Sequence, residues 1–527
     1  MQPYSLLFAL FVAALWVVHR LAGSGSHRDG QWVVRLVGSL AFYAWVDLRS
    51  LGFLLVTSLS TWYAARTLGA LDEQGAQSAA AASSRAEKKE IRQAFKRRRW
   101  HVVLACLVAN FGILGYLKYW NVILGYLGQD EGPLASRLLL PLGISFYTFT
   151  ALGYLIDVYN GKAAPEGSYA RFLLFVSWFP QLLQGPINQW QQTGERLCAY
   201  HAPDGMRTRR ALLLVLYGAL KKYALADVLV GVISSCLDHI DYSTPGAVVV
   251  LGIVLYSLQQ YGDFSGGIDM VEGVSELFGV PMAQNFRQPY FSTSLAEFWR
   301  RWHMSLGAWM RTYVFYPLAM RSSMMRLNKW GVAHLGKTVG RTLSACIANI
   351  VVFLLVGLWH GAQAHYLLWG LYNGVVIALS DLMRPLFDRA RAALRIDADS
   401  VPWRAWGIVR TFAIVNAGRY FDRLTDVSTM GLAFRNTLLN FQPSGVGTWL
   451  AVLYPTVYLK FALGFAGAAL LIVFVVDVLL EWGVDVRGVV LSLPIVMRSA
   501  VYVGLGALVA FSFAAAVSGG GFLYANF

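Results

Sequence analysis

The sequence predicts an all-α protein that crosses a membrane many times. Of its 527 residues, 57% are hydrophobic and only 14% are charged, and the mean hydropathy is +0.50. A soluble domain carries roughly 25% charged residues, so this composition excludes an ordinary soluble fold. The apolar residues gather in long runs with polar stretches between them, which is typical of helices that span a bilayer.

Apolar runs follow one another along the chain. A helix needs about 20 residues to span the hydrocarbon core, and several runs are shorter, so we expect some helices to be tilted, buried or re-entrant. We predict about eleven to thirteen membrane segments, together with interfacial helices. The first run lacks a basic flank and a convincing cleavage site, which favours a membrane helix over a secretory signal. The runs are Leu6–Val18, Trp32–Trp45, Leu51–Ala65, Val102–Tyr116, Leu138–Leu155, Phe172–Leu183, Leu212–Val230, Ala247–Leu258, Leu343–Leu358, Tyr366–Leu379, Phe461–Leu480 and Val501–Ala516.

Most of the residues that give the net charge of +15 lie in the loops between these runs. Cytoplasmic loops of membrane proteins carry an excess of Lys and Arg, so we do not interpret the charge as a nucleic-acid site. We predict N-terminal membrane helices at 1–66 and a basic cytoplasmic loop at 67–100, which contains a linker rich in Ala, Ser and Gln and touches anionic headgroups. We predict a core at 101–434. It is followed by C-terminal membrane helices with an aromatic tail at 435–527.

Polar residues first interrupt the apolar pattern at residues 175–186. This stretch contains two prolines and two glutamines, among them Gln184. Proline breaks the helical hydrogen-bond ladder, and non-helical backbone survives at membrane depth only inside protein or beside a cavity. Two interpretations remain open, a kinked helix with a loop at its end and a re-entrant cavity wall.

A second polar stretch places Asp263, Ser265 and Asp269 directly after an apolar run. Ionisable side chains are costly against lipid, so we expect these to face the protein interior. At a helix start, Asp263 or Ser265 would serve as an N-cap, and we favour this structural role for one of the two. Turn-forming residues around Asn285 then lead into the next segment.

Residues 297–317 combine tryptophans, arginines and a histidine. A helical period of about 3.6 residues places Trp299 and His303 on one face, while Arg300 and Arg301 can reach headgroups or an anionic substrate. Because Trp and Tyr favour the membrane interface, one interpretation is an interfacial amphipathic helix. The other is a helix that lines a cavity and presents His303 inward.

His360 lies at the end of an apolar run, between Trp359 and Gly361, with Gly357 one turn earlier. Glycine allows another chain or a ligand to approach closely. The histidine is therefore either a hydrogen-bonded core residue or a catalytic base. A neutral imidazole, with its ordinary pKa of about 6.5, can remove a proton from an attacking hydroxyl, which suits acyl transfer.

The four cysteines are scattered without the spacing of a metal or redox site. The sequence also lacks the glycine-rich phosphate-binding loops and the zinc-protease motif. We therefore expect no metal and no tightly bound cofactor.

Six groups of motif residues follow one another in order between about Leu138 and Phe434. They are Leu140–Phe149 with Tyr154–Tyr159, Gln184–Pro186, Asp263–Gly266 with Asp269, Asn285-Phe286 with Gln288–Tyr290, Glu297–His303, and Gly357–Gly361. With these motifs the stretch resembles the membrane-bound O-acyltransferase (MBOAT) family. It is similar to the bacterial branch of alginate O-acetyltransferases, the membrane subunit of peptidoglycan O-acetylation, and the D-alanyl transfer protein of teichoic acid synthesis.

The resemblance implies a ring of membrane helices around a central funnel or tunnel, with re-entrant and interfacial helices. It makes residues 101–434 the catalytic core, His360 the catalytic histidine, and His303 a second catalytic residue near the tunnel. Departures at Gly267, Ile268 and Thr312 bear on the acceptor and the partner rather than on the fold. The substrate-binding residues that we expect from the motifs are Gln184, Asp263, Ser265, Asp269, Asn285, Trp299, Arg300 and Arg301.

The reaction implied is transfer of an acyl group, expected to be acetyl, from a cytoplasmic thioester to an extracytoplasmic hydroxyl. The donor would be acetyl-CoA or an acidic acyl carrier protein, and the acceptor a cell-envelope polysaccharide or a partner acyltransferase of the SGNH type. D-alanyl transfer to teichoic acid is the alternative within the class. A polytopic transporter or flippase is the alternative of another class, although no inverted repeat is visible. We expect the protein to lie among the lipids of the plasma membrane and to have no nucleic-acid partner.

An aromatic hexapeptide, Phe522–Phe527, follows three glycines at the end of the sequence. One interpretation is an interfacial aromatic anchor. The other rests on the resemblance, because the acetylation and D-alanylation systems have similar tails with a tyrosine that is proposed to carry the acyl group. Tyr524 is the candidate acyl relay here, and Ala525 stands where such tails often have Phe.

Overall fold

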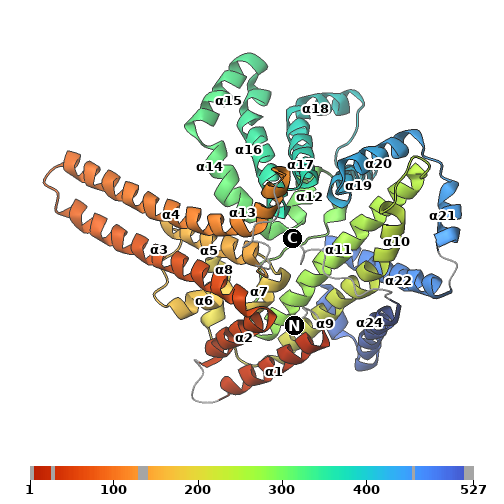
Figure 1. Ribbon diagram of the computed structural model, residues 1–527, viewed down its shortest axis with the longest axis horizontal. Coiled ribbons are helices and arrows are strands. Elements are labelled where there is room, and N and C mark those ends of the chain that lie inside the picture. The colour runs from red at the N-terminus through yellow and green to blue at the C-terminus, as the bar shows by residue number, and fades with distance from the viewer. Residues whose placement is uncertain (1–4, 25–29, 129–140, 454–456, 516–527) are drawn as a thin grey trace. The chain divides into compact units, whose positions relative to one another are not determined.

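A computed structural model describes residues 5–24, 30–128, 141–453 and 457–515 of the chain. All regular secondary structure in these ranges is helical, which confirms the predicted all-α class (Figure 1). The chain divides into two compact units, which are treated separately below. The first is Met1–Ala211 with Val271–Ala283, and the second is Leu212–Met270 with Gln284–Phe527. These boundaries differ from the four parts expected from the sequence.

Among its described residues, the first unit has eight α-helices with the beginning of a ninth and the end of another. Tyr43 fixes two of its segments to each other, because its hydroxyl donates a 2.8 Å hydrogen bond to the carbonyl oxygen of Leu142. The helices are α1 (Leu6–Ala22), α2 (Gln31–Val46), α3 (Leu48–Ala80), α4 (Arg85–Tyr126), α5 (Ile144–Tyr159), α6 (Tyr169–Ser177), α7 (Phe179–Gln184), α8 (Trp190–Cys198), the start of α9 (Gly205–Ala219) and the end of α11 (Gly246–Leu277).

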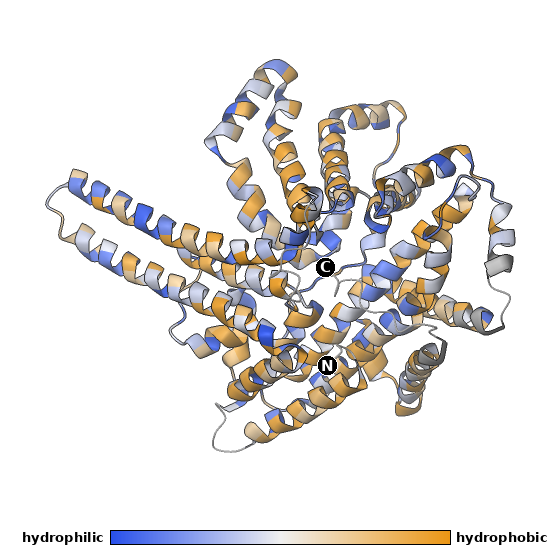
Figure 2. Cartoon of the chain, viewed as in Figure 1, coloured by the Kyte–Doolittle hydropathy of each residue, from blue (hydrophilic) through white to orange (hydrophobic). Residues whose placement is uncertain are grey.

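Helices α3 and α4 lie side by side as a long hairpin (Figure 1). The region expected to be a linker and a partly helical loop is thus helical except at residues 81–84. Ser84 caps α4 by accepting a 3.1 Å hydrogen bond from the amide of Glu87, which fixes the turn between the two helices. Figure 2 shows hydrophilic residues gathered toward the tip of this hairpin.

The proline-containing stretch of the first unit forms two short helices with a break between them. Helix α6 ends at Ser177 and α7 begins at Phe179, because Trp178 has a non-helical backbone, with ψ 110°, and Pro180 occupies the first turn of α7. An extended segment follows α7 from Gly185. Its residues are buried, as expected of non-helical backbone in a membrane protein.

The second unit contains the remaining elements. Here α9 and α11 pack with their backbones close together, since a Cβ on Gly218 would lie 2.6 Å from the carbonyl oxygen of Gly266. The elements are η2 (Leu220–Asp227), α10 (Val228–Leu237), η3 (Pro289–Phe291), α12 (Leu295–Arg301), α13 (Met304–Met310), η4 (Arg311–Phe315), α14 (Tyr316–Ala319), α15 (Ser322–Leu335), α16 (Lys337–His360), α17 (Ala364–Leu382), α18 (Arg384–Ala393), α19 (Val401–Arg423), α20 (Val427–Leu439), α21 (Gly445–Leu453), α22 (Val457–Glu481), α23 (Val486–Ser492) and α24 (Ile495–Ala515). Of these, η2 and η4 are π-helices and η3 is a 3₁₀-helix.

Within the described residues, five helices are long and apolar enough to cross a membrane. They are α4, α11, α16, the Leu463–Glu481 part of α22 and the Ile495–Ser512 part of α24. The pair α17 and α18, bent by 54°, would make a sixth if it is one span. The larger number predicted from the sequence includes helices that are shorter, less apolar or interrupted, and the protein is a multi-pass membrane protein on either count.

Candidate functional site

His303 lies between two short helices of the second unit. Its backbone is left-handed, with φ 47°, and it stands at the start of α13 directly after α12 has ended. We expected one continuous helix here, and that prediction is wrong. Asn285 accounts for the break, because its Oδ1 accepts hydrogen bonds from the Ser305 amide at 3.1 Å and hydroxyl at 2.8 Å, and its carbonyl oxygen accepts one from Met304.

The imidazole of His303 is buried and has a defined orientation. Its Nδ1 lies 3.2 Å from Asn285 Oδ1, and its ring packs edge-on against Phe264 at 4.8 Å between centroids. Burial lowers the pKa of His303 to about 3, so this side chain is neutral at physiological pH. Asn285 thus positions the histidine rather than lining the cavity described below.

His360 is the last residue of α16. The predicted close approach beside it is present, because a Cβ on Gly357 would lie 2.4 Å from the carbonyl oxygen of Tyr366. The turn from α16 into α17 brings aromatic rings around the imidazole, with Tyr366 stacked at 5.8 Å and Trp369 edge-on at 5.4 Å. The flanking glycine thus lets α17 come close enough to form this aromatic surrounding.

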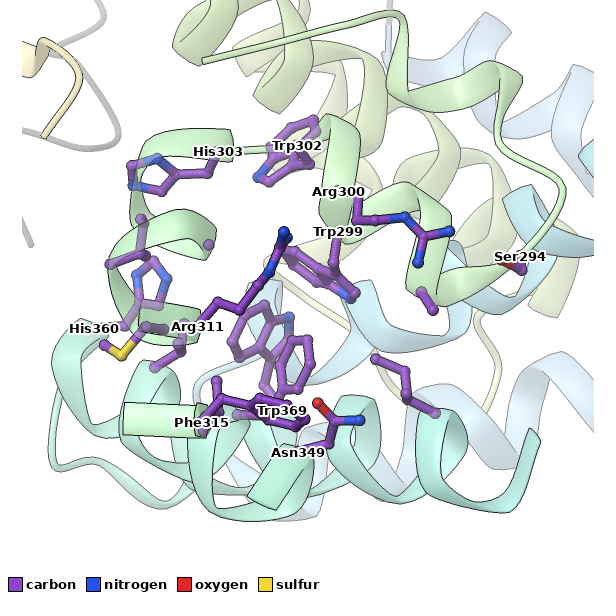
Figure 3. Close-up of a pocket in the computed structure, with 18 of the residues that line it drawn as sticks. Ser294, Trp299, Arg300, Trp302, His303, Arg311, Phe315, Asn349, His360 and Trp369 are labelled. Atoms are coloured by element: carbon purple, nitrogen blue, oxygen red, sulfur yellow. The ribbon is translucent and has the colours of Figure 1, made fainter. Parts of the chain in front are cut away.

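Both histidines line one cavity of about 450 Å³ in the second unit (Figure 3). Trp359 lies next to both, with ring centroids 5.9 Å from His303 and 4.8 Å from His360. This agrees with the cavity-lining interpretation of the segment. The space is large enough for a small ligand with one polar and one apolar part.

Trp299 and Arg300, two of the predicted substrate-binding residues, also line this cavity. Trp299 is held by a 3.0 Å hydrogen bond from its Nε1 to Asn373 Oδ1 and packs edge-on against Trp369 at 5.3 Å. Figure 3 shows Arg311 reaching into the space between His360 and Trp299. Arg311 comes from the π-helix η4, a helix type that occurs often at functional sites.

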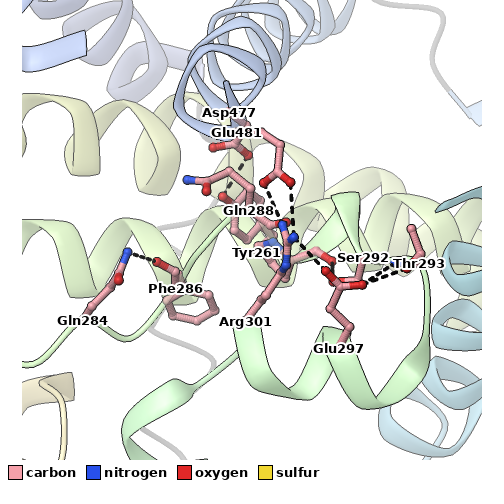
Figure 4. A network of polar contacts seen from close by, with 11 residues as sticks. Tyr261, Gln284, Phe286, Gln288, Ser292, Thr293, Glu297, Arg301, Asp477 and Glu481 are labelled. Atoms are coloured by element: carbon pink, nitrogen blue, oxygen red, sulfur yellow. Dashed lines mark hydrogen bonds and ion pairs between the residues drawn. The ribbon is translucent and has the colours of Figure 1, made fainter. Parts of the chain in front are cut away.

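Arg301 does not line the cavity with the histidines. Its guanidinium group donates to both carboxylate oxygens of Glu481, at 2.7 and 3.1 Å, and pairs with Glu297 at 2.7 Å (Figure 4). Burial raises the pKa of Glu297, but hydrogen bonds from Thr293 and the charge of Arg301 outweigh burial and lower it below its ordinary value. We expected Arg301 to bind substrate, whereas its contacts are those of a structural ion pair.

Asp263, Ser265 and Asp269 lie within the 32-residue helix α11, so the expected N-cap role is wrong. They contact two buried lysines of η2. Lys222 Nζ lies 2.6 Å from Asp263 and 2.7 Å from Asp227. Lys221 pairs with Asp269 and donates a 3.0 Å hydrogen bond to Ser265.

This ionic cluster does not line the cavity of His303 and His360. Sequence reasoning missed Lys221 and Lys222, although two adjacent lysines inside the apolar run Leu212–Val230 were a visible signal of buried ion pairs. Sequence reasoning also missed Trp369 and Asn373. Their spacing of four residues, which places them on one helix face, is the only signal that would group them.

The two other predicted site residues are not part of this cavity as the structure describes it. Gln184 belongs to the first unit, where it ends α7 with 2% of its surface exposed. Neither polar atom of its side chain has a hydrogen-bond partner among the described residues. Tyr524 lies outside the described residues.

The chemistry available in this cavity is acid–base and electrostatic. It contains two imidazoles, and the guanidinium groups of Arg300 and Arg311 are at its wall. Among the described residues no group of three or more His, Cys, Asp or Glu side chains could hold a metal ion. A neutral imidazole can accept a proton from a hydroxyl, and the guanidinium groups can bind an anionic substrate.

The sequence was compared with protein families and with known proteins. Residues 165–418 match the model of MBOAT, the membrane-bound O-acyltransferase family, and the matched region includes both histidines. A probable alginate O-acetylase of Azotobacter vinelandii is 31% identical over 73% of this chain and 68% of its own length. The corresponding protein of Pseudomonas aeruginosa is 32% identical over 65% of this chain and 59% of its length. A teichoic acid D-alanyltransferase of Streptococcus thermophilus is 29% identical over 57% of this chain and 73% of its length.

Proposed function

Because the chain belongs to the membrane-bound O-acyltransferase family, we propose that it transfers a short acyl group to a hydroxyl of a cell-envelope polymer, with His360 as the general base. The observation that carries this proposal is the cavity that His303 and His360 share with Arg300 and Arg311. The names of the relatives favour acetyl as the acyl group and a polysaccharide as the acceptor.

In the proposed reaction the acceptor hydroxyl approaches His360. The imidazole removes the hydroxyl proton while the oxygen attacks the carbonyl carbon of a thioester donor, such as acetyl-CoA or an acylated carrier protein. The carbon–sulfur bond then breaks, and the leaving thiolate takes the proton back from the imidazolium. Burial keeps His303 neutral, and its Nδ1 donates to Asn285 Oδ1, so its Nε2 carries no proton and can accept a hydrogen bond from the acceptor hydroxyl.

The remaining groups bind the reactants. Arg300 and Arg311 attract a phosphorylated donor or an acidic carrier. We place the protein in the plasma membrane, with the donor in the cytoplasm and the acceptor outside. There an extracytoplasmic acyltransferase partner receives the acyl group. Tyr524 is the proposed relay to that partner, since its hydroxyl can accept the acyl group as an ester.

D-alanyl transfer to teichoic acid is the second candidate. The teichoic acid D-alanyltransferase matches over 73% of its own length, a larger share than the alginate O-acetylases. The arrangement of His360 and the arginines would serve either acyl group. Labelling cells with radioactive acetate or with radioactive D-alanine, and counting the base-labile label in the envelope, distinguishes the two.

The test of the proposed function is His360→Ala in the full chain. We expect base-labile acyl esters in the envelope polymer to fall by about 10²- to 10⁴-fold, because removal of a general base typically costs this much in rate. The matched control is His334→Ala, since His334 is an exposed histidine of α15 that does not line the cavity. Wild-type ester levels in the His360 variant at equal membrane abundance would contradict the proposal.

A further inference from the structure

A groove runs along the α3–α4 hairpin of the first unit, and it shares no residue with the candidate site. Its volume is about 630 Å³. Helix α4 contributes Lys88, Arg92, Lys96 and Arg99 to it, and α3 contributes Asp72 as the one acidic residue. Asp72 is already paired with Arg99 at 3.0 Å. The other three cations, Lys88, Arg92 and Lys96, therefore have no acidic partner among the residues that line the groove.

These three cations form a regular row. Lys88, Arg92 and Lys96 are four residues apart on α4, which corresponds to about 6 Å between neighbours along the axis. All three are exposed, and none has an ion pair or a side-chain hydrogen bond among the described residues. The row is too long for one phosphate group, and its spacing equals that of carboxylates placed every fourth residue on another helix.

The opposite wall of the groove is small and close-packed. It consists of Gly75, Ala76, Ala79 and Ala80 of α3. The floor is closed by Phe95, since a Cβ on Gly75 would lie 3.0 Å from its ring. Small residues let a third helix approach the pair closely, whereas long side chains would hold it away.

The reach of α4 favours a soluble partner over the lipid surface. The apolar part of α4 begins near Val102, so Lys88 is 14 residues, or about 21 Å, further along the helix. A typical tilt of about 20° shortens that distance by only about 1 Å. The headgroup layer adds roughly 5–8 Å on each side of the hydrocarbon core, so the outer end of the row extends past it.

From these observations we propose that the α3–α4 groove, defined by Lys88, Arg92, Lys96 and the small residues of α3, docks an acidic helix of a soluble protein partner. The helix would lie between α3 and α4 with carboxylates at four-residue spacing facing the three cations. The partner would act on the side of the membrane that the hairpin faces, and the contact would set affinity for the partner without taking part in the chemistry at His360.

The test uses the full chain in a neutral detergent and a fluorescent helical peptide of Ala with Glu at every fourth position. We expect fluorescence anisotropy to show saturable binding that weakens as salt is raised from about 50 to 300 mM. A groove variant with Lys88→Glu, Arg92→Glu and Lys96→Glu should bind roughly tenfold more weakly. The matched control variant has Arg85→Glu, Lys89→Glu and Arg97→Glu, since it changes the same net charge on the same helix outside the groove.

Each other outcome overturns the proposal. Equal loss of binding in both variants would mean that overall charge attracts the peptide and that the groove has no role. No binding by the wild-type protein would exclude the docking helix. Groove-dependent binding to vesicles of anionic lipid, with no binding of the peptide, would assign the cations to the membrane surface. All six substituted side chains are exposed, so the variants should fold, and size-exclusion profiles check this.

Discussion

Asn285 is the residue on which the position of His303 depends. A histidine with positive φ is uncommon, and here the strain is offset by hydrogen bonds from Ser305 to the Asn285 side chain. Helical periodicity could not reveal this, because Ser305 and Asn285 are twenty positions apart in the sequence. The sequence left open whether His303 lies at the membrane interface or faces a cavity, and the break that turns it to the cavity is a tertiary effect.

Replacing Asn285 with Leu should therefore disturb both fold and activity. The Ser305 amide and hydroxyl would lose a buried acceptor, and each unsatisfied group costs about 1–3 kcal/mol. We expect a lower midpoint of thermal unfolding and reduced acyl transfer in membranes. Gln284→Leu is the control, because the neighbouring amide is exposed and bonds only to Phe286 among the described residues. A full-activity Asn285→Leu variant would show that His303 needs no such support.

Arg300 and Arg301 are neighbours with different expected roles. Arg300 lines the cavity, so Arg300→Ala should raise the apparent KM for the donor and leave thermal stability unchanged. Arg301→Ala should lower stability, because Glu297 and Glu481 would lose their common cation. Initial rates over a range of donor concentrations, with thermal unfolding of the same preparations, separate the two. An equal rise of the donor KM in both variants would contradict the different roles expected for Arg300 and Arg301.

At the scale of the element, the π-helix η2 is the least predictable part of the fold. Its Lys222 and Asp227 are five residues apart, the spacing of backbone hydrogen bonds in a π-helix. The apolar run around them predicts a membrane helix. Hydropathy does not distinguish a π-helix from an α-helix. Its two lysines meet the acids of α11, so the motif around Asp263 acts in this structure as a counter-charge inside the protein.

Lys222→Met should destabilise the protein by about 3–5 kcal/mol, because it leaves Asp263 and Asp227 buried without their cation. The midpoint of thermal unfolding in detergent measures this, and Lys329→Met on the exposed side of α15 is the control. Adding Asp263→Asn to Lys222→Met should recover part of the loss, since it removes one of the two carboxylates that have lost Lys222. If the double variant is less stable than the single one, the pairing does not hold the two elements together.

At the scale of the whole molecule, composition was enough to predict a helical membrane protein, and the ordered motifs were enough to predict its family. The positions of His303 and His360 in one cavity also follow from the resemblance. The positions at which helices end could not be predicted from the sequence, as the α3–α4 hairpin shows. Its Ala-rich stretch has the composition of a linker, yet Ala is the best helix former, and a partner helix alongside stabilises it.

The orientation of the molecule in the membrane is predicted by that hairpin. Its dense positive charge predicts that the turn at residues 81–84 lies in the cytoplasm. Ser83→Cys is the suitable probe, because Ser83 is exposed and, unlike Ser84, does not cap α4 through its side chain. Cys198 should first be replaced by Ser, since it is the one cysteine of the four that is not buried. We expect an impermeant maleimide to label the introduced thiol only after the cells are permeabilised, and labelling in intact cells would reverse the topology and with it the side from which the donor reaches His360.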